Sequence, residues 1–169
     1  MAIFTNLSTC LEMEIPASYG LLFIPLALSW LVNIFLTVMV GNARKKYDVQ
    51  YPNLYAPADH KDAVKFNCVQ RAHQNTLESW APVMVTMFAT GLVYPVSSSI
   101  SGVIWCMGRV VYGIGYSFSP SLRLPGGLLT HVGDFPLMVM AIRIAWETLN
   151  DGAAMDLVKG VVSGTGAEL

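Results

Sequence analysis

An uncharged apolar stretch over residues 19–40 restricts the chain to a membrane fold. Its roughly 22 residues, at about 1.5 Å per helical residue, are enough to cross a hydrocarbon core of about 30 Å. Pro25 and Asn33 are its only irregularities, and we interpret both as structural. Only 12% of the 169 residues are charged and 54% are hydrophobic, whereas soluble domains carry about 25% charged residues. The sequence therefore predicts an integral membrane protein of one domain.

Three further helices are predicted over residues 66–94, 98–119 and 127–149, with a polar loop over 42–65. That loop holds five of the ten Lys and Arg residues, so the positive-inside rule makes it cytoplasmic. Four spans would then place both termini on the lumenal side. The chain divides into an N-terminal segment (1–17), a four-helix membrane domain (18–149) and a flexible C-terminal tail (150–169). Residues 1–17 contain no Lys or Arg, which argues against a signal peptide.

Net charge and cysteine usage exclude some functions. The formal charge of -1 gives no support for nucleic-acid binding. Cys10, Cys68 and Cys106 are odd in number and widely spaced, so they form neither a disulfide framework nor a CxxC pair. Any thiol chemistry would therefore use a thiol supplied by another molecule.

The predicted second helix carries polar side chains in an otherwise apolar protein. Arg71, Asn75 and Glu78 fall at i, i+4 and i+7, so they share one helix face. A charge near the middle of a bilayer costs at least about 2.5 kcal/mol, so such residues normally face a bundle interior or a wet cavity. This face is either a structural Arg–Glu lock or a ligand site. Pro82, in the same helix, predicts a kink beside it.

A second polar face lies at the cytoplasmic end of the predicted third helix. Arg109, Tyr112 and Tyr116 are spaced i, i+3 and i+7. Tyrosines at such a position form either an interfacial aromatic belt or part of a site. Pro120 and Pro125 then predict a short loop that carries Arg123 on the same side as the basic cluster around Arg44.

The predicted fourth helix carries two polar pairs. His131 and Asp134, at i and i+3, could bind a metal or relay a proton, but two ligands without a third favour a structural pair and no metal site. Arg143 and Glu147, at i and i+4, could pair or snorkel toward the interface.

Three segments together resemble one family. Ala-Arg-Lys-Lys-Tyr (43–47), Arg-Ala-His-Gln-Asn-Thr-Leu-Glu (71–78) and Gly-Arg-Val-Val-Tyr-Gly-Ile-Gly-Tyr (108–116), the last followed by Arg123, are similar to the membrane-associated proteins of eicosanoid and glutathione metabolism (MAPEG), and within them to the type 3 microsomal glutathione transferases. The resemblance covers roughly residues 18–148. It implies an all-α, left-handed four-helix bundle in the endoplasmic reticulum membrane, assembled as a homotrimer with glutathione held between subunits.

The resemblance also implies roles for single residues. Arg123 matches the catalytic arginine beside the glutathione sulfur, and Lys45 stands where some relatives have a second arginine. The glutathione-binding positions of one subunit are matched by Arg71, Asn75, Glu78, Tyr112 and Tyr116. Arg44 and His73 match positions contributed by the neighbouring subunit. One departure is that Ser79 and Trp80 stand where relatives place a tyrosine.

The implied function is that of a glutathione transferase or glutathione-dependent peroxidase. Glutathione, as co-substrate, would react as its thiolate with a lipophilic electrophile, such as a leukotriene-type epoxide, or with a lipid hydroperoxide. The alternative is a non-catalytic adaptor that binds a membrane lipid, as one branch of the family does. A thiolate-stabilising cation at Arg123 favours the enzyme. A transporter fits less well, because the polar faces lie near one membrane surface.

Overall fold

The computed structural model describes residues 15–152, 155 and 159, and within them it contains four long α-helices and no strand. The helices are α1 (Phe23–Tyr47), α2 (Ala63–Gly91), α3 (Pro95–Phe118) and α4 (Arg123–Asn150), and two short 3₁₀ segments, η1 (Ala17–Leu22) and η2 (Pro120–Leu122), precede α1 and α4. This confirms the all-α prediction. The predicted N-terminal segment and C-terminal tail lie mostly outside the described residues.

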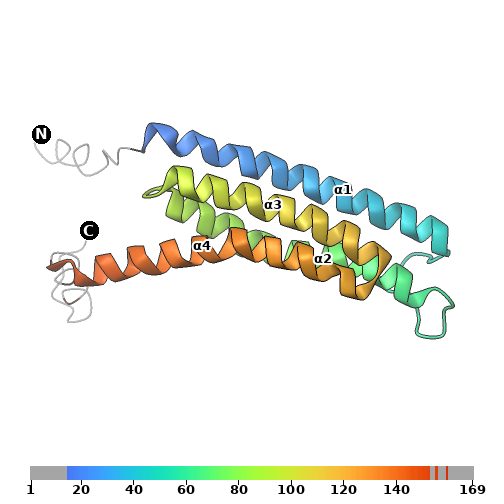
Figure 1. The fold of residues 1–169 in the computed structure, drawn as a ribbon. Helices are drawn as coiled ribbons and strands as arrows, with labels where there is room; N and C mark the ends of the chain where they lie inside the picture. The colour runs from blue at the N-terminus through green and yellow to red at the C-terminus, as the bar shows by residue number, and fades with distance from the viewer. Residues whose placement is uncertain (1–14, 153–154, 156–158, 160–169) are drawn as a thin grey trace, which may run out of the picture.

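The four helices run side by side in alternating directions, so the start of α1 and the end of α4 lie at the same end of the bundle (Figure 1). The loop after α1 and the turn before α4 lie at the other end. This agrees with the up-and-down arrangement expected from four consecutive spans. Figure 1 also shows a bend in the middle of α4, where Pro136 interrupts the backbone hydrogen bonding.

Two segments of the described chain are long and apolar enough to cross a membrane, Ala17–Tyr47 and Pro120–Asn150. The helices α2 and α3 are also long, with 29 and 24 residues, but they carry the polar faces described above. The outer helices α1 and α4 therefore have the clearest membrane-spanning character, and α2 and α3 lie between them (Figure 1).

Close backbone approach makes α3 the centre of the bundle, where it packs against the other three helices and most extensively against α4. A Cβ atom on Gly108 would lie 2.5 Å from the backbone nitrogen of Thr130, and one on Gly133 would lie 2.5 Å from that of Trp105. Side chains at these positions would force the two helices apart. The small residues thus hold the α3 polar face firmly beside α4.

Most helix boundaries differ from the prediction by a few residues, and two of these differences bear on the site. The first helix continues to Tyr47, because Asp48, with a positive φ of 54°, is the residue that ends it. The fourth helix begins at Arg123, so Arg123 opens a helix and does not lie in the predicted loop. Pro125 lies in the first turn of α4, where a missing backbone N–H is tolerated. The prediction treated Pro125 only as a helix breaker and therefore placed the start of the fourth helix after it.

Candidate functional site

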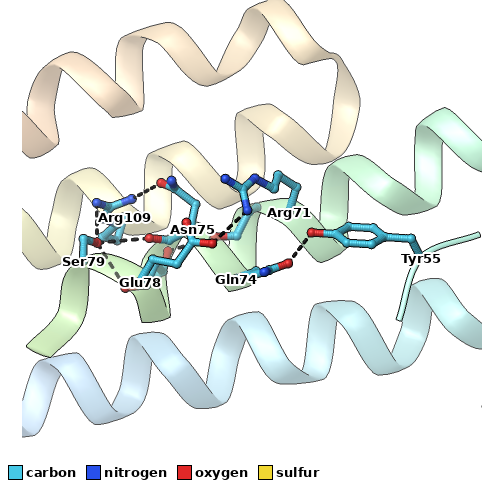
Figure 2. A network of polar contacts seen from close by, with 9 residues as sticks. Tyr55, Arg71, Gln74, Asn75, Glu78, Ser79 and Arg109 are labelled. Carbon is cyan, nitrogen blue, oxygen red and sulfur yellow. Dashed lines mark hydrogen bonds and ion pairs between the residues drawn. The ribbon is translucent and has the colours of Figure 1, made fainter. Parts of the chain in front are cut away.

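The Arg71 and Glu78 side chains form an ion pair on α2, with Arg71 Nη1 2.9 Å from Glu78 Oε1 (Figure 2). The pair confirms that the two residues share a helix face. The side chains are 43% and 46% exposed in the single chain, so the pair lies on the outer surface of the bundle.

Asn75 lies between them in sequence but turns to a different partner. Arg109 of α3 donates from Nη1 to Asn75 Oδ1 at 2.8 Å and from Nη2 to Ser79 Oγ at 2.6 Å (Figure 2). The predicted three-residue face therefore separates into an outer ion pair and an inner network. The reason is that the long Arg109 side chain offers Asn75 a buried donor, whereas Arg71 is already occupied by Glu78.

Arg109 is the polar centre that the sequence reasoning did not recognise. Its side chain is 5% exposed and lies beside the rings of Trp105 and Tyr112, at 5.2 and 5.6 Å from their centroids. Its Nε has no hydrogen-bond partner among the described residues. The sequence carried a signal for this role, since a charge in an apolar helix packed by glycines must find its partners inside the protein.

Tyr112, Tyr116 and Arg123 form a continuous group at the α3–α4 junction. The two tyrosine rings meet edge to face, with centroids 5.5 Å apart and an interplanar angle of 82°. Arg123 donates from Nη1 to the Tyr116 hydroxyl oxygen at 3.0 Å, and its guanidinium carbon lies 5.2 Å from that ring's centroid. The structure therefore brings Arg123, which the resemblance places beside the sulfur, together with the two tyrosines that the resemblance assigns to glutathione binding.

Two cavities flank this group. The first, which we call the polar cavity, has a volume of about 610 Å³ and is lined by Tyr55, Ala58, Ala63, Val64, Asn67, Cys68, Arg71 and Tyr116. The second, which we call the apolar cavity, has a volume of about 620 Å³ and is lined by Tyr112, Arg123, Leu124, Pro125, Gly127, Leu128 and His131. Tyr116 and Arg123 line one cavity each and are hydrogen-bonded to one another, so their contact lies where the two cavities approach.

The loop after α1 supplies one wall of the polar cavity. The Tyr55 hydroxyl donates to Gln74 Oε1, and Asn67 exchanges hydrogen bonds of 2.8 and 3.3 Å with the backbone of Ala56. Near the start of α2, Lys65 donates to Asp62 at 2.9 Å, and this hydrogen bond holds the pKa of Asp62 below its ordinary value. Sequence reasoning did not single out Tyr55, because nothing in the loop shows that it folds back onto α2.

Arg44 turns toward its own loop. It is 8% exposed and donates to the carbonyl oxygens of Val49, Asn53 and Leu54 at 3.4, 2.8 and 3.5 Å, while its guanidinium lies over the Tyr51 and Phe66 rings. Arg44 therefore holds the loop against the end of α1. Its role in a neighbouring subunit's site stays a prediction.

His73 lies between α2 and α1, on a side of α2 away from the ion pair. Its Nε2 is 3.4 Å from Thr37 Oγ1 of the same chain. As for Arg44, a contribution to a neighbour's glutathione site stays a prediction.

Ser79 and Trp80, which replace the family tyrosine, both serve the bundle interior. Ser79 Oγ accepts from Arg109, and Trp80 Nε1 donates to Ser29 Oγ of α1 at 3.0 Å. The Trp80 N–H is thus engaged within the chain. At this departure from the family pattern, both side chains therefore bond to neighbouring helices, and neither lines the polar cavity.

The two pairs predicted on α4 both form. His131 Nδ1 is 3.1 Å from Asp134 Oδ1, and Arg143 Nε donates to Glu147 Oε1 at 2.8 Å. Among the described residues there is no group of three or more His, Cys, Asp or Glu side chains that could hold a metal ion.

Comparison with known proteins agrees with this architecture. The MAPEG family model matches residues 22–145, which include α1 from its first residue, all of α2 and α3 and most of α4. An uncharacterized protein of the cyanobacterium Synechocystis is 31% identical over 123 residues, which cover 72% of this chain and 85% of that protein. The helices that build the polar face, both tyrosines and Arg123 all fall inside the matched range, and the chain belongs to the MAPEG family, whose members include glutathione transferases and related membrane proteins.

Proposed function

We propose that this protein is a membrane-bound glutathione transferase and glutathione-dependent peroxidase. The observation that carries the proposal is the meeting of a polar and an apolar cavity at the Arg123–Tyr116 hydrogen bond. Such a junction suits a reaction between a water-soluble thiol and a lipid, because Arg71 and Asn67 offer polar groups in one cavity, leucines line the other, and a cation lies between them.

Glutathione is a tripeptide with two carboxylates and one amine, and the polar side offers partners for each. Arg71 lines the polar cavity and suits a carboxylate, while Glu78, its ion-pair partner, suits the amine. Asn75 belongs to the same helix face, although its carbonyl oxygen accepts from Arg109 in the single chain. Arg44 and His73 would come from a neighbouring subunit, as the resemblance implies.

Arg123 is the proposed activator of the thiol. Lowering the pKa of a thiol from about 8.5 to about 6.5 requires roughly 2.7 kcal/mol of differential stabilisation. A unit charge about 4 Å away contributes on the order of 4 kcal/mol at an effective dielectric constant of 20. One guanidinium at the cavity junction is therefore sufficient. Tyr116 holds that guanidinium in place, since its hydroxyl oxygen accepts from Arg123.

The apolar cavity suits the second substrate. Apart from Tyr112, Arg123 and His131, its lining is aliphatic or glycine, and two leucines of α4 form much of it. A lipophilic electrophile could enter from the bilayer, where the thiolate would add to it. With a lipid hydroperoxide, the thiolate would reduce it to the alcohol, and a second glutathione would complete the disulfide.

The homotrimer is part of the proposal, and the outer ion pair supports it. Glu78 lies at the middle of the 29-residue α2, and both it and Arg71 are nearly half exposed in the single chain. Charged side chains at that depth do not face lipid, so a neighbouring subunit is expected to cover them. The mass of the detergent-solubilised complex, measured by light scattering, tests this directly.

The proposed location is the endoplasmic reticulum membrane, with the loop 48–62 in the cytoplasm. Arg44, Lys45 and Lys46, in the last turn of α1, give the basic excess that supports this orientation. An Asp59→Cys variant in sealed microsomes should react with a membrane-impermeant thiol reagent. Labelling by membrane-permeant reagents alone would show that the loop lies on the lumenal side.

The decisive experiment measures thiolate formation. Glutathione added to purified trimer should produce the ultraviolet absorbance of a thiolate at neutral pH, and the complex should then conjugate an activated aryl chloride or reduce a lipid hydroperoxide. Saturated glutathione binding, measured independently by calorimetry, with no thiolate signal and no turnover would favour the lipid-binding adaptor.

A further inference from the structure

A histidine–aspartate pair on α4 has no role in the chemistry described so far. His131 Nδ1 lies 3.1 and 3.2 Å from the two carboxylate oxygens of Asp134, and its ring stacks on Phe135 with centroids 5.2 Å apart. The imidazole is thus held from two sides while its side chain remains 56% exposed. Polar pairs at membrane depth are costly and tend to mark functional positions.

The apolar cavity connects this pair to the proposed thiolate site. Arg123 and His131 line the same cavity of about 620 Å³, with Leu124 and Leu128 on the helix between them. The two polar residues are eight positions apart, which is about 12 Å along the axis of α4. His131 therefore stands at the deeper end of the cavity, farther into the membrane than Arg123.

That separation matches a displacement reaction in which the leaving atom is oxygen. A sulfur about 4 Å from the guanidinium can attack a centre about 3 Å away. The oxygen released lies one bond farther on, and a hydrogen bond of about 2.8 Å then reaches a proton donor. Laid end to end, these lengths come to about 11 Å, which is close to the backbone rise of about 12 Å between Arg123 and His131.

We propose that His131, positioned by Asp134, donates the proton to the oxygen that leaves from the second substrate. The inference rests on the proposed function and narrows its substrate class to lipids that carry a hydroperoxide or an epoxide. The acyl chain would lie along the leucines of the apolar cavity, with the oxygen function between the thiolate and the imidazole.

The proposed step balances for both substrates. With a hydroperoxide, the sulfur bonds to the terminal oxygen, the O–O bond breaks, and the alkoxide takes the Nε2 proton of the His131 imidazolium to become the alcohol. Glutathione sulfenic acid then condenses with a second glutathione to give the disulfide and water, so sulfur supplies both electrons. With an epoxide, an S–C bond forms, a C–O bond breaks and the alkoxide is protonated without a redox change. The proton released when the glutathione thiol ionised returns to His131 through water, which restores the imidazolium.

Asp134 is a positioning residue in this proposal. Asp134 accepts from Nδ1–H and stabilises the imidazolium form of His131, so that Nε2–H is left to face substrate as the proton donor. Asp134 also lines a small groove between α2 and α4, and its carboxylate interacts electrostatically with Arg109 of α3. Asp134 therefore lines the α2–α4 groove, whereas His131 lines the apolar cavity.

The test compares substrates whose leaving groups differ in their need for a proton. Chloride leaves an activated aryl chloride without needing a proton, whereas an alkoxide needs one. His131→Gln should lower hydroperoxide reduction and epoxide opening by about 100-fold, with aryl chloride conjugation and the thiolate absorbance close to native. Asp134→Asn should lower the same two reactions by about tenfold. Matched controls are His60→Gln in the loop and Glu147→Gln at the far end of α4, and both should leave all rates unchanged.

Each outcome is decisive. If native protein conjugates the aryl chloride and His131→Gln reduces hydroperoxide at the native rate, the proton-donor role is wrong while the proposed function stands. Equal losses toward all substrates would make His131 structural and also overturn the inference. If native protein forms no thiolate and turns over none of the substrates, both proposals fail.

A second measurement needs no variant. Heavy water should slow hydroperoxide reduction by the native protein but not its aryl chloride conjugation, and equal effects on the two rates would count against the proposal.

Discussion

Two arginines of this protein stand beside tyrosines near the α3–α4 junction, yet their surroundings differ. Arg109 is 5% exposed and directs two donors to the neutral acceptors Asn75 and Ser79. Arg123 is exposed, makes one hydrogen bond to the Tyr116 hydroxyl and lines the apolar cavity. The first guanidinium joins helices, whereas the second keeps donors available for another molecule.

Burial and the presence of fixed acceptors therefore distinguish structural from reactive cations in a membrane bundle. A buried guanidinium with fixed acceptors stabilises the fold, because removing it leaves polar groups unpaired inside the protein. An exposed one at a cavity junction stabilises a charge that appears only during reaction. Stability and turnover should therefore respond to different arginines.

The largest effect on stability is expected for Arg109→Ala. Two hydrogen bonds from a charged donor to the half-buried acceptors Asn75 and Ser79 are lost, so the free energy of unfolding should fall by about 3 kcal/mol. Unfolding in mixed micelles, followed by circular dichroism, measures it. Arg123→Ala is the matched control and should cost less than about 1 kcal/mol. Equal stabilities for the two variants would break the comparison.

The largest effect on chemistry is expected for Arg123→Ser. Without the cation, bound glutathione should ionise about two pH units higher, and turnover near neutral pH should fall roughly 100-fold, with glutathione affinity nearly unchanged. Arg123→Lys should recover part of the loss, because it keeps the charge without the planar donors. The measurement is a pH profile of aryl chloride conjugation. A profile identical to native would move the activating role to Lys45 or Tyr112.

Arg71 provides an intermediate case, because it is half exposed and paired with Glu78. If Arg71 holds a glutathione carboxylate in the ground state, Arg71→Ala should weaken binding by about 1.5 to 3 kcal/mol, which is tenfold or more in Kd. Calorimetric titration measures this, with Arg143→Ala, which breaks another exposed ion pair, as the control. Unchanged affinity in a folded trimer would remove Arg71 from the site.

The smallest effect on glutathione binding is expected for Arg44→Ala. Because its donors already bond the loop carbonyls, the loss should appear first as faster amide hydrogen exchange over residues 49–54. The stability cost should be about 1.5 kcal/mol. The Kd for glutathione should change less than with Arg71→Ala, and a larger change would show that Arg44 acts mainly in a neighbouring subunit's site.

Much of the fold was available from the sequence. Long uncharged stretches separated by polar turns predicted four helices, and the i, i+3, i+4 and i+7 spacings predicted the ion pairs Arg71–Glu78 and Arg143–Glu147 and the His131–Asp134 contact. These features depend on contacts within one helix. The 3.6-residue period alone decides them, so no knowledge of neighbouring helices was needed.

The contacts between helices were decided only by the tertiary structure. A helical period groups Asn75 with Arg71 and Glu78, but it does not reveal that Arg109 approaches from α3 and takes Asn75 as its partner. It also does not reveal that Arg44 bonds its own loop. Long guanidinium side chains reach whichever acceptors the packing brings near. The sequence alone thus determined which residues are polar at membrane depth, and the packing of α3 against α2 and α4 determined which of them are buried in the bundle and which face a cavity.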